Sequence, residues 1–236
     1  MAKVSIIIPC KRKEEAEECI RHCKKLNYHE ILVMSDEVTG DIPPPRKRDM
    51  GAKLAKGDVL AFIDADAYPS KQWLNMIPDY RVYTGPAVTP PEDSFWQKVS
   101  GKTYELLAFS NIWRFKRITM RQVYDIPSCN MIIPKRIFFD VGGFNCDIYP
   151  GEDTYLSNKL DMAGYVMFQS PLCLVYHHRR TLGGHFKQIA NYGFMRGKLT
   201  KMFGGKLTYF IPPISIVLAG ASFLVYGFMF IKGWFK

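Results

Sequence analysis

The chain has 236 residues, 47% hydrophobic and 23% charged, a composition that excludes a low-complexity or disordered protein and allows one large domain or two small ones. Its formal charge of +10 is uneven, because nine of the 32 basic residues but none of the 22 acidic residues follow Asp161. This basic tail indicates an anionic partner, such as a phospholipid surface or a phosphorylated ligand, and six cysteines without disulfide or zinc spacing fit free thiols in a reducing compartment.

The first part of the sequence predicts alternating strands and helices. The β-branched run 3–9 and the run 30–34 are predicted strands, and the strongly helix-forming stretch 11–26 lies between them. A strand, a helix and a second strand form a βαβ unit, which requires a parallel sheet. A predicted helix over 46–55 then leads to the apolar run Leu60–Ile63, which is typical of a strand buried on both faces.

Two carboxylates, Asp64 and Asp66, directly follow this third strand. A spacing of two residues places them on the same side of an extended chain, and ligands of α/β sheets bind beyond the carboxyl ends of the strands. Asp36 follows the second strand in the same manner. A hard cation such as Mg²⁺ or Mn²⁺, carrying a diphosphate, would satisfy two such acids. The alternative is a solvated turn closed by Pro69.

The remaining predicted elements continue this alternation. In chain order they are a short helix from 71, a strand over 81–88, an amphipathic helix over 90–111, a strand over 128–134, a helix over 135–141, a helix from 151 to about 163, and one bent strand or two strands over 165–176. The aromatic residues of the helix over 90–111, including Phe95 and Trp96, are predicted to pack in the core, with a substrate platform as the alternative.

The run Arg48–Pro69 carries a specific family resemblance. Its stretches RDMGAKLAKGD and FIDADAYP are similar to the pattern R-N-x-G-x-x-x-A-x-G-D-x-x-x-F-x-D-A-D-x-x-P of family 2 glycosyltransferases with the GT-A fold, with Asp49 where the family usually has Asn. The strand with Asn130, the short helix after it and the turn Gly142–Phe144 also resemble the family. Over about residues 3–200, the resemblance implies an α/β, Rossmann-like fold in which helices flank a mixed, mostly parallel sheet.

The resemblance also implies that a nucleotide-diphosphate sugar lies across the carboxyl ends of the strands. Asp36 would contact the base, Asp64 the ribose or base side, and Asp66 a Mg²⁺ or Mn²⁺ ion that bridges the diphosphate. His177 or His178 would complete the metal coordination, and the sequence leaves open which of the two does so. The other residues implied in binding the nucleotide sugar are Pro9, Arg48, Asn130 and Arg179.

The catalytic base is implied at the start of the helix from 151. Acids in a first helical turn suit the helix dipole, which is the simplest explanation of Glu152 and Asp153. In the family this Glu-Asp position supplies the base, so Asp153, with Glu152 beside it, would take the proton of an acceptor hydroxyl while displacement inverts the anomeric carbon. A polyprenyl phosphate needs no base, so these acids favour a hydroxyl acceptor, such as a lipid-linked saccharide or a glycolipid.

The C-terminal part of the sequence predicts contact with a membrane. The acid-free stretch 183–206 mixes apolar with basic residues, which is typical of an amphipathic helix on an anionic membrane surface. Residues 209–231 carry no charge and would span about 34 Å as a helix, enough for a bilayer core of about 30 Å. We therefore expect a catalytic domain over 1–182, a membrane-surface segment over 183–206, and a transmembrane helix with a short tail over 207–236. More lysines precede the span than follow it, which predicts a cytoplasmic catalytic domain.

The alternatives to this function are a polyprenyl-phosphate glycosyltransferase and a non-catalytic, membrane-tethered GT-A scaffold. A scaffold gives no reason for acids at Asp36, Asp64, Asp66 and Asp153. A nucleotidyltransferase would need a glycine-rich phosphate loop after the first strand, where this chain has Pro9–Lys13 without glycine. A nucleic-acid binder is suggested only by the net charge, which lies beside the predicted membrane span.

Overall fold

The computed structural model describes residues 2–75, 81–107, 119–144 and 148–204, together with Val225 and Met229. The chain divides into two compact units, Met1–Gly193 and Phe194–Lys236. The predicted membrane span over 209–231 lies outside the described residues, apart from Val225 and Met229. Among the residues that are described, no helix combines the length and the apolar character needed to cross a membrane.

The strands of the first unit form a larger and a smaller sheet. Their bounds are β1 Val4–Pro9, β2 Glu30–Met34, β3 Val59–Ile63, β4 Ala67–Pro69, β5 Val82–Thr84, β6 Ala87–Val88, β7 Arg121–Val123, β8 Asn130–Pro134, β9 Met167–Gln169 and β10 Val175–His177. Within the described part of the chain, the larger sheet has the order β2-β1-β3-β8-β5-β9-β7 and the smaller one β4-β10-β6. β1 pairs in parallel with β2 and β3, whereas β8 runs antiparallel to β3 and β5, so the predicted mixed sheet is confirmed.

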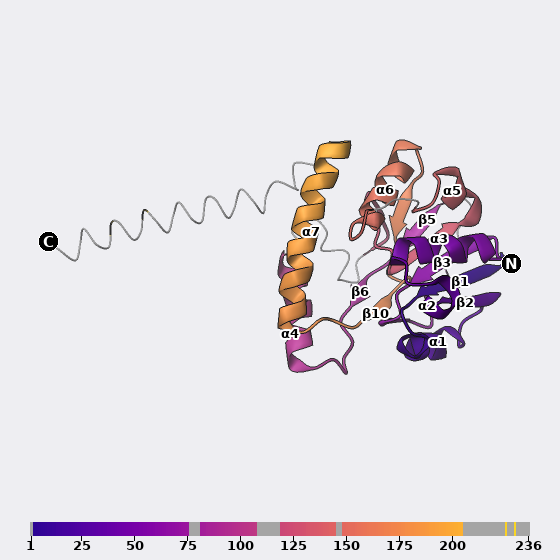
Figure 1. Cartoon of the computed structure of the whole chain (residues 1–236), viewed down its shortest axis with the longest axis horizontal. Coiled ribbons are helices and arrows are strands. Elements are labelled where there is room, and N and C mark those ends of the chain that lie inside the picture. The colour runs from indigo at the N-terminus through magenta and orange to yellow at the C-terminus, as the bar shows by residue number, and fades with distance from the viewer. Residues whose placement is uncertain are drawn as a thin grey trace. The chain divides into compact units, whose positions relative to one another are not determined.

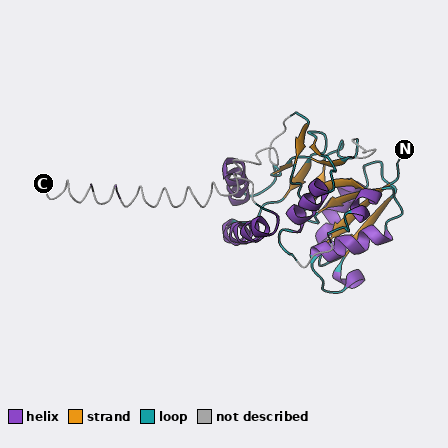
Figure 2. Cartoon of the chain, turned by 90° about the horizontal axis from the view of Figure 1, so that it is seen from above, coloured by secondary structure: helices purple, strands orange, loops and turns teal. Residues whose placement is uncertain are grey.

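Helices of the first unit cover both faces of the larger sheet (Figures 1 and 2). In chain order the helices of the described residues are η1 Lys13–Ala16, α1 Glu17–Cys23, α2 Asp36–Thr39, α3 Pro44–Leu54, α4 Phe95–Leu107, α5 Lys135–Asp140, α6 Glu152–Met162 and α7 Leu182–Phe203, the last of which continues into the second unit. Successive residues of a strand point to opposite faces of the sheet. Ile6 and Ile8 therefore pack in the cluster that contains Cys19 of α1, and Ile7 packs in the cluster that contains Leu156 of α6.

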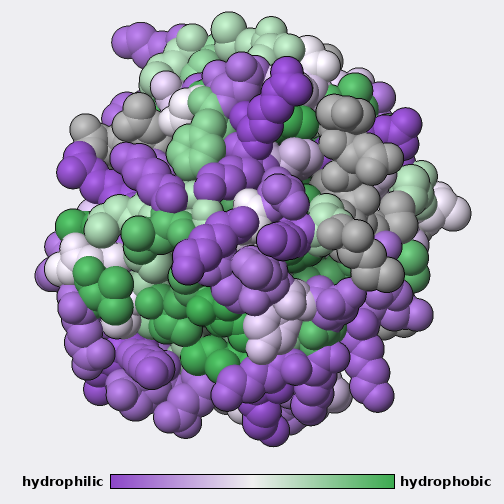
Figure 3. All heavy atoms as spheres, turned by 90° about the vertical axis from the view of Figure 1, so that its right-hand side faces the viewer, coloured by the Kyte–Doolittle hydropathy of each residue, from purple (hydrophilic) through white to green (hydrophobic). Residues whose placement is uncertain are grey.

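The edge of the larger sheet differs from its centre. β1 and β3 are buried along their whole length, but β2 is half-buried except at Met34, because it pairs with β1 alone. The continuous apolar runs of β1 and β3 therefore reflect burial on both faces of the sheet. On the surface, the face of the molecule on the side of the N-terminus shows hydrophobic side chains gathered among hydrophilic ones (Figure 3).

The predicted elements are confirmed in type except for the short helix from 71, because the described residues 71–75 form turns, and several boundaries are different. The predicted helix over 11–26 is divided into η1 and the shorter α1, and the predicted strand over 81–88 is divided into β5 and β6, which belong to different sheets. Gly85 lies at this division, where an added Cβ would stand 1.9 Å from the carbonyl oxygen of Cys173. Close backbone contact therefore interrupts the strand at a residue that only glycine can supply.

The prediction that Phe95 and Trp96 pack in the core is wrong. The two side chains are 70% and 53% exposed and stack edge to face, with their ring centroids 5.2 Å apart. They occupy the first turn of α4, whereas Ser100, one turn later, is buried and bonds to His185 at 2.7 Å. The helix packs through its later turns, so its first turn leaves two aromatic side chains in contact with solvent.

Candidate active site

The acids after β3 and the end of β10 form a potential metal site. Asp64 and Asp66 lie in the turn between β3 and β4, and antiparallel pairing of β4 with β10 sets His177 opposite Ala67. Asp64, Asp66 and His177 each offer a ligand atom within 4.8 Å of the others. His177 Nε2 is 3.1 Å from Asp66 Oδ1. The fold therefore brings His177, and not the ring of His178, to the two acids.

The charges of Asp66 and His177 stabilise one another. Burial by itself would raise the pKa of Asp66, but the charge of His177 lowers it below its ordinary value. Burial would likewise lower the pKa of His177, but Asp66 raises it well above its ordinary value. The two groups therefore form an ion pair at neutral pH. Two carboxylates and an imidazole are also ligands that suit Mn²⁺, and a metal would take the place of the imidazole proton.

Arg48 connects this cluster to the start of α6. The side chain of Arg48 is 4% exposed, and its Nη2 donates to Asp64 Oδ1 at 2.6 Å while Nη1 donates to Glu152 Oε1 at 3.0 Å. The guanidinium also lies over the ring of Phe144, 5.6 Å from its centroid. Burial would lower the pKa of Arg48, but Asp64 and Glu152 raise it above its ordinary value. Arg48 thus fixes the two acidic segments relative to each other.

Glu152 and Asp153 are adjacent in sequence but differ in environment. Glu152 is buried, and besides Arg48 its carboxylate accepts from the Ser128 hydroxyl at 3.3 Å and from the Gly151 amide at 3.0 Å. Asp153 is half-buried and accepts from the amide of Thr154 at 2.8 Å. Glu152 is therefore held by the protein framework, whereas Asp153 remains the more accessible acid of the pair.

Asp49, the residue that departs from the family pattern, stabilises the turn Gly142–Phe144 that follows α5. Asp49 Oδ1 accepts the backbone N–H of Phe144 at 2.9 Å, directly after Gly143, which has a φ of +61°. A Cβ on Gly143 would stand 2.8 Å from Asp49 Oδ1. An asparagine would present the same side-chain oxygen, so either residue type can accept this hydrogen bond.

Asp36 follows the carboxyl end of β2, as the sequence predicts, and is the first residue of α2. Its carboxylate pairs with Lys47 Nζ, which also donates to the carbonyl oxygen of Cys10 at 2.5 Å. Lys47 is buried, whereas the Asp36 side chain is 32% exposed. Pro9 ends β1 next to Cys10. This corner therefore has a partly accessible carboxylate that is held by a buried lysine, and Lys47 is a site residue that sequence reasoning missed.

Asn130 and Arg179 contact the protein framework in the structure. The Asn130 amide accepts from Trp73 Nε1 at 2.8 Å and donates to the carbonyl oxygens of Gly85 and Cys173 at 3.0 and 2.7 Å. Arg179 donates to Thr89 Oγ1 at 3.2 Å and to the carbonyl oxygen of Ala87. Both side chains thus make internal hydrogen bonds between strands and loops.

Two further residues, Arg180 and Tyr149, lie near the metal cluster. Arg180 is one of the two arginines that the family resemblance implies at the phosphate, whereas Tyr149 was missed by sequence reasoning. Arg180 is exposed, and its charge contributes to lowering the pKa of Asp66. Burial raises the pKa of Tyr149, with further contributions from Glu152 and Asp64. The adjacent pair of arginines after the histidines was the available signal for Arg180. For Tyr149 we find no sequence signal.

Comparison with known proteins gives two levels of similarity. No protein-family model matches the chain. It is 28% identical over 146 residues to the pre-mycofactocin glycosyltransferase of Mycobacterium tuberculosis, covering 58% of this chain and 30% of the relative. It is 26% identical over 160 residues to glycosyltransferase AglE of Haloferax volcanii, covering 67% of this chain and 51% of the relative. The chain thus spans about a third to a half of the length of these curated relatives.

Solved structures share the fold at lower identity. GalNAc-T7, crystallised with UDP, GalNAc and Mn²⁺, superposes with a TM-score of 0.57 at 16% identity, covering 78% of this chain and 45% of that one. The mannosyltransferase PcManGT from Pyrobaculum calidifontis, in complex with GDP-Man and Mn²⁺, gives 0.61 at 17% identity, covering 89% and 67%. The mixed α/β fold is therefore that of known glycosyltransferases, and together with the sequence similarities it supports a glycosyltransferase.

Proposed function

We propose that the chain is a metal-dependent, inverting glycosyltransferase of family 2 that uses a nucleotide-diphosphate sugar. The observation that carries the proposal is the convergence of Asp64, Asp66 and His177 beyond the end of β3, within 4.8 Å of one another. Ligands of such sheets bind at this position. Asp66 and His177 would hold Mn²⁺ or Mg²⁺, which when bound neutralises charge on the leaving diphosphate.

The donor would lie between the cluster and the end of β1. Asp36, positioned by Lys47, is suited to bind the base, and Asp64, positioned by Arg48, the ribose or base side. The exposed Arg180 is suited to contact a phosphate, because its charge already acts on Asp66. In this assignment Arg48 orients other groups and does not itself touch the nucleotide.

Asp153 is proposed as the base that takes the proton of the acceptor hydroxyl. Arg48, Ser128 and the Gly151 amide engage Glu152, so proton transfer at Glu152 would break a buried ion pair. Asp153 is more accessible and lies in the first turn of the same helix. Attack by the acceptor oxygen on the face opposite the leaving diphosphate inverts the anomeric carbon.

The acceptor is proposed to be a lipid-linked saccharide or a glycolipid at an anionic membrane surface. The exposed aromatic side chains of the first unit include Phe95 and Trp96 at the start of α4 and Phe186 in α7, the last being 69% exposed. The stretch 183–206 has no acidic residue, and basic, aromatic surfaces of this kind bind anionic lipid interfaces. We extend the proposal to a cytoplasmic catalytic domain over 1–182 and a membrane helix within 207–236.

The test is nucleotide release by the full chain in detergent, measured over a panel of UDP-, GDP- and other sugar donors with Mn²⁺, Mg²⁺ or a chelator. We expect one nucleotide to be released only with metal. Asp66→Ala should weaken metal-dependent nucleotide binding at least about tenfold, and Asp161→Ala, which removes an exposed acid of α6, should not.

Asp153→Asn separates the steps, because it should keep donor binding and lose about 10²- to 10⁴-fold in transfer to a hydroxyl acceptor. Retained transfer in Asp153→Asn with a polyprenyl phosphate acceptor would favour the polyprenyl-phosphate enzyme. If nucleotide binding is the same with chelator as with Mn²⁺, and the same in Asp66→Ala as in the wild type, the transferase hypothesis is refuted. The non-catalytic GT-A scaffold would then remain.

A further inference from the structure

A second group of potential metal ligands surrounds His178. Glu18 of α1, Glu92 from the loop after β6 and His178, which directly follows β10, each offer a ligand atom within 4.8 Å of the others. Glu18 and His178 are separated by 160 residues in the sequence. None of the three residues has a part in the proposed transfer reaction, so this group, which we call the Glu18 cluster, requires its own explanation.

The ring of His178 is oriented as in a metal-bound histidine. Its Nδ1 is 2.5 Å from Asp93 Oδ1, and Asp93 is buried and also accepts the backbone N–H of Arg179 at 3.0 Å. A histidine that binds metal commonly donates its other ring N–H to a carboxylate, which fixes the tautomer. With Nδ1 donating to Asp93, Nε2 faces Glu18 Oε2 at 3.2 Å and is the atom available to a cation.

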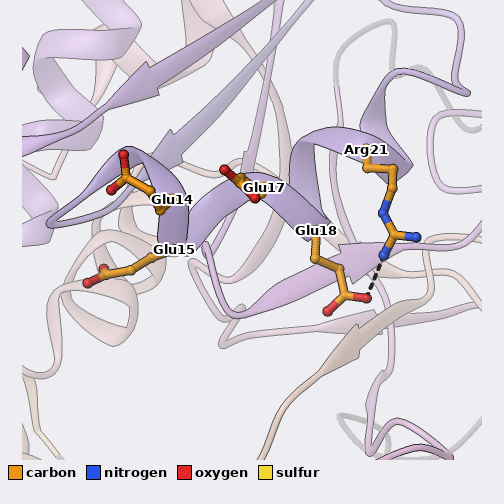
Figure 4. Close-up of a pocket in the computed structure, with 5 residues that line it drawn as sticks. All are labelled: Glu14, Glu15, Glu17, Glu18 and Arg21. Carbon is orange, nitrogen blue, oxygen red and sulfur yellow. Dashed lines mark hydrogen bonds and ion pairs between the residues drawn. The ribbon is translucent and has the colours of Figure 1, made fainter.

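Each carboxylate of the Glu18 cluster has its own supporting group. The Tyr68 hydroxyl donates to Glu92 Oε1 at 2.5 Å, and the Tyr68 ring stacks on Tyr176 with centroids 4.9 Å apart. Arg21 Nη2 donates to Glu18 Oε1 at 2.9 Å (Figure 4). The other carboxylate oxygens of Glu18 and Glu92 can therefore turn to a shared ion while these bonds persist.

An ion pair with His178 alone does not account for the arrangement. Asp93 by itself is enough to neutralise a protonated imidazole, yet Glu18 and Glu92 approach the same ring from two other segments. Carboxylates that gather in this way repel one another unless a cation lies between them. The excess of negative charge at the Glu18 cluster is what a divalent ion would neutralise.

We propose that Glu18, Glu92 and His178 bind a divalent cation in a site separate from Asp64, Asp66 and His177. One imidazole nitrogen and two carboxylate oxygens, with a water as fourth ligand, suit Zn²⁺. The ligand atoms of a tetrahedral zinc site lie about 3.4 Å apart. Glu92 is exposed and Glu18 half-buried, and the three ligand atoms already lie within 4.8 Å of one another, so a rotamer adjustment of the glutamates can bring them to this spacing.

The consequence of such a site is structural. The ion would join α1 to the end of β10 and to the loop after β6. Its ligand His178 directly follows His177, which belongs to the first cluster. It would thereby fix the end of β10, which carries His177. This inference does not depend on the transferase activity, because its test measures metal binding alone.

The experiment is a competition for Zn²⁺ between a chromophoric chelator and the purified full chain that carries Asp66→Ala, which removes the first cluster. We expect about one Zn²⁺ per chain, and Glu18→Gln, Glu92→Gln or His178→Gln in that background should each weaken binding at least about tenfold. Neither glutamate is buried, so these two variants are expected to fold even if His178→Gln does not.

Glu17→Gln is the matched control. Glu14, Glu15, Glu17 and Glu18 line one acidic hollow with Arg21 (Figure 4), but Glu17 is not part of the Glu18 cluster. Zn²⁺ affinity should therefore be unchanged in Glu17→Gln. Equal weakening by Glu17→Gln and Glu18→Gln would mean diffuse attraction by the acidic hollow, and the absence of Zn²⁺ binding in the Asp66→Ala chain would equally overturn the proposal.

Discussion

Replacing Arg48 with methionine tests whether the buried ion pairs determine the stability of the candidate site. Methionine keeps much of the side-chain volume and a contact with Phe144, but it removes the charge between Asp64 and Glu152. The side chain of Glu152 is 7% exposed and that of Asp64 27%. The substitution therefore leaves the Glu152 carboxylate buried, and the donors that remain to it among the described residues are the Ser128 hydroxyl and the Gly151 amide.

Removing one partner of a buried ion pair costs about 3–5 kcal/mol, and the more accessible Asp64 adds little to this. In a protein of this size, about 1 kcal/mol lowers Tm by about 2–4 °C. We therefore expect Arg48→Met to lower Tm by about 6–20 °C in a thermal unfolding experiment on the full chain. The double variant Arg48→Met with Glu152→Gln should recover at least about 2 kcal/mol, because the buried charge is then absent.

Two results would contradict this reasoning. If Arg48→Met lowers Tm by less than about 2 °C, the pair is solvated and the burial of Arg48 does not determine its energetics. If the single and double variants unfold at the same temperature, Arg48 and Glu152 are not coupled. The link between the metal cluster and the helix that carries Asp153 would then have to be sought elsewhere.

Three further predictions concern the framework of the site. Gly85→Ala should lower the free energy of unfolding by about 3 kcal/mol or more, because the added Cβ would meet the Cys173 carbonyl oxygen at 1.9 Å. Gly183→Ala should be tolerated, because the space around its Cβ is open, and similar Tm values for the two variants would contradict this reasoning. Burial raises the pKa of the Cys173 thiol to about 12 from 9.0, so the folded state retains this proton and stability falls as the pH rises from about 9 to 12. At about pH 10.5 the wild type should have lost about 2 kcal/mol more than Cys173→Ala relative to pH 8, and parallel curves of unfolding free energy would refute the assignment. Asn130→Ala should lower the free energy of chemical unfolding by about 3 kcal/mol or more, because Trp73 Nε1 and two carbonyl oxygens lose their partner. Asn158→Ala loses one bond at 2.8 Å and should lower it by less than about 1.5 kcal/mol. Equal losses in the two variants would mean that the Asn130 bonds are not buried.

The sequence alone located the acids of the candidate site because they follow strands with a strong local pattern. The apolar run of β3 identifies a strand that is buried on both faces, and its last residue therefore identifies Asp64 and Asp66 as strand-end acids. The strand ending before Asp36 and the helix beginning at Glu152 are predicted by the same local rules. Short strands without periodicity, such as β4 and β7, had no signal of this kind and were missed.

The sequence by itself determined the alternation of strands and helices and the acids at their ends, because hydrophobic periodicity and capping depend on residues that are close in the chain. Only the tertiary structure decided which histidine meets Asp66, because the pairing of β10 with β4 sets the direction of His177 across more than a hundred residues. It alone paired Arg48 with Glu152, which lie 104 residues apart. Such contacts depend on register and on the packing of distant segments, and no local pattern encodes them.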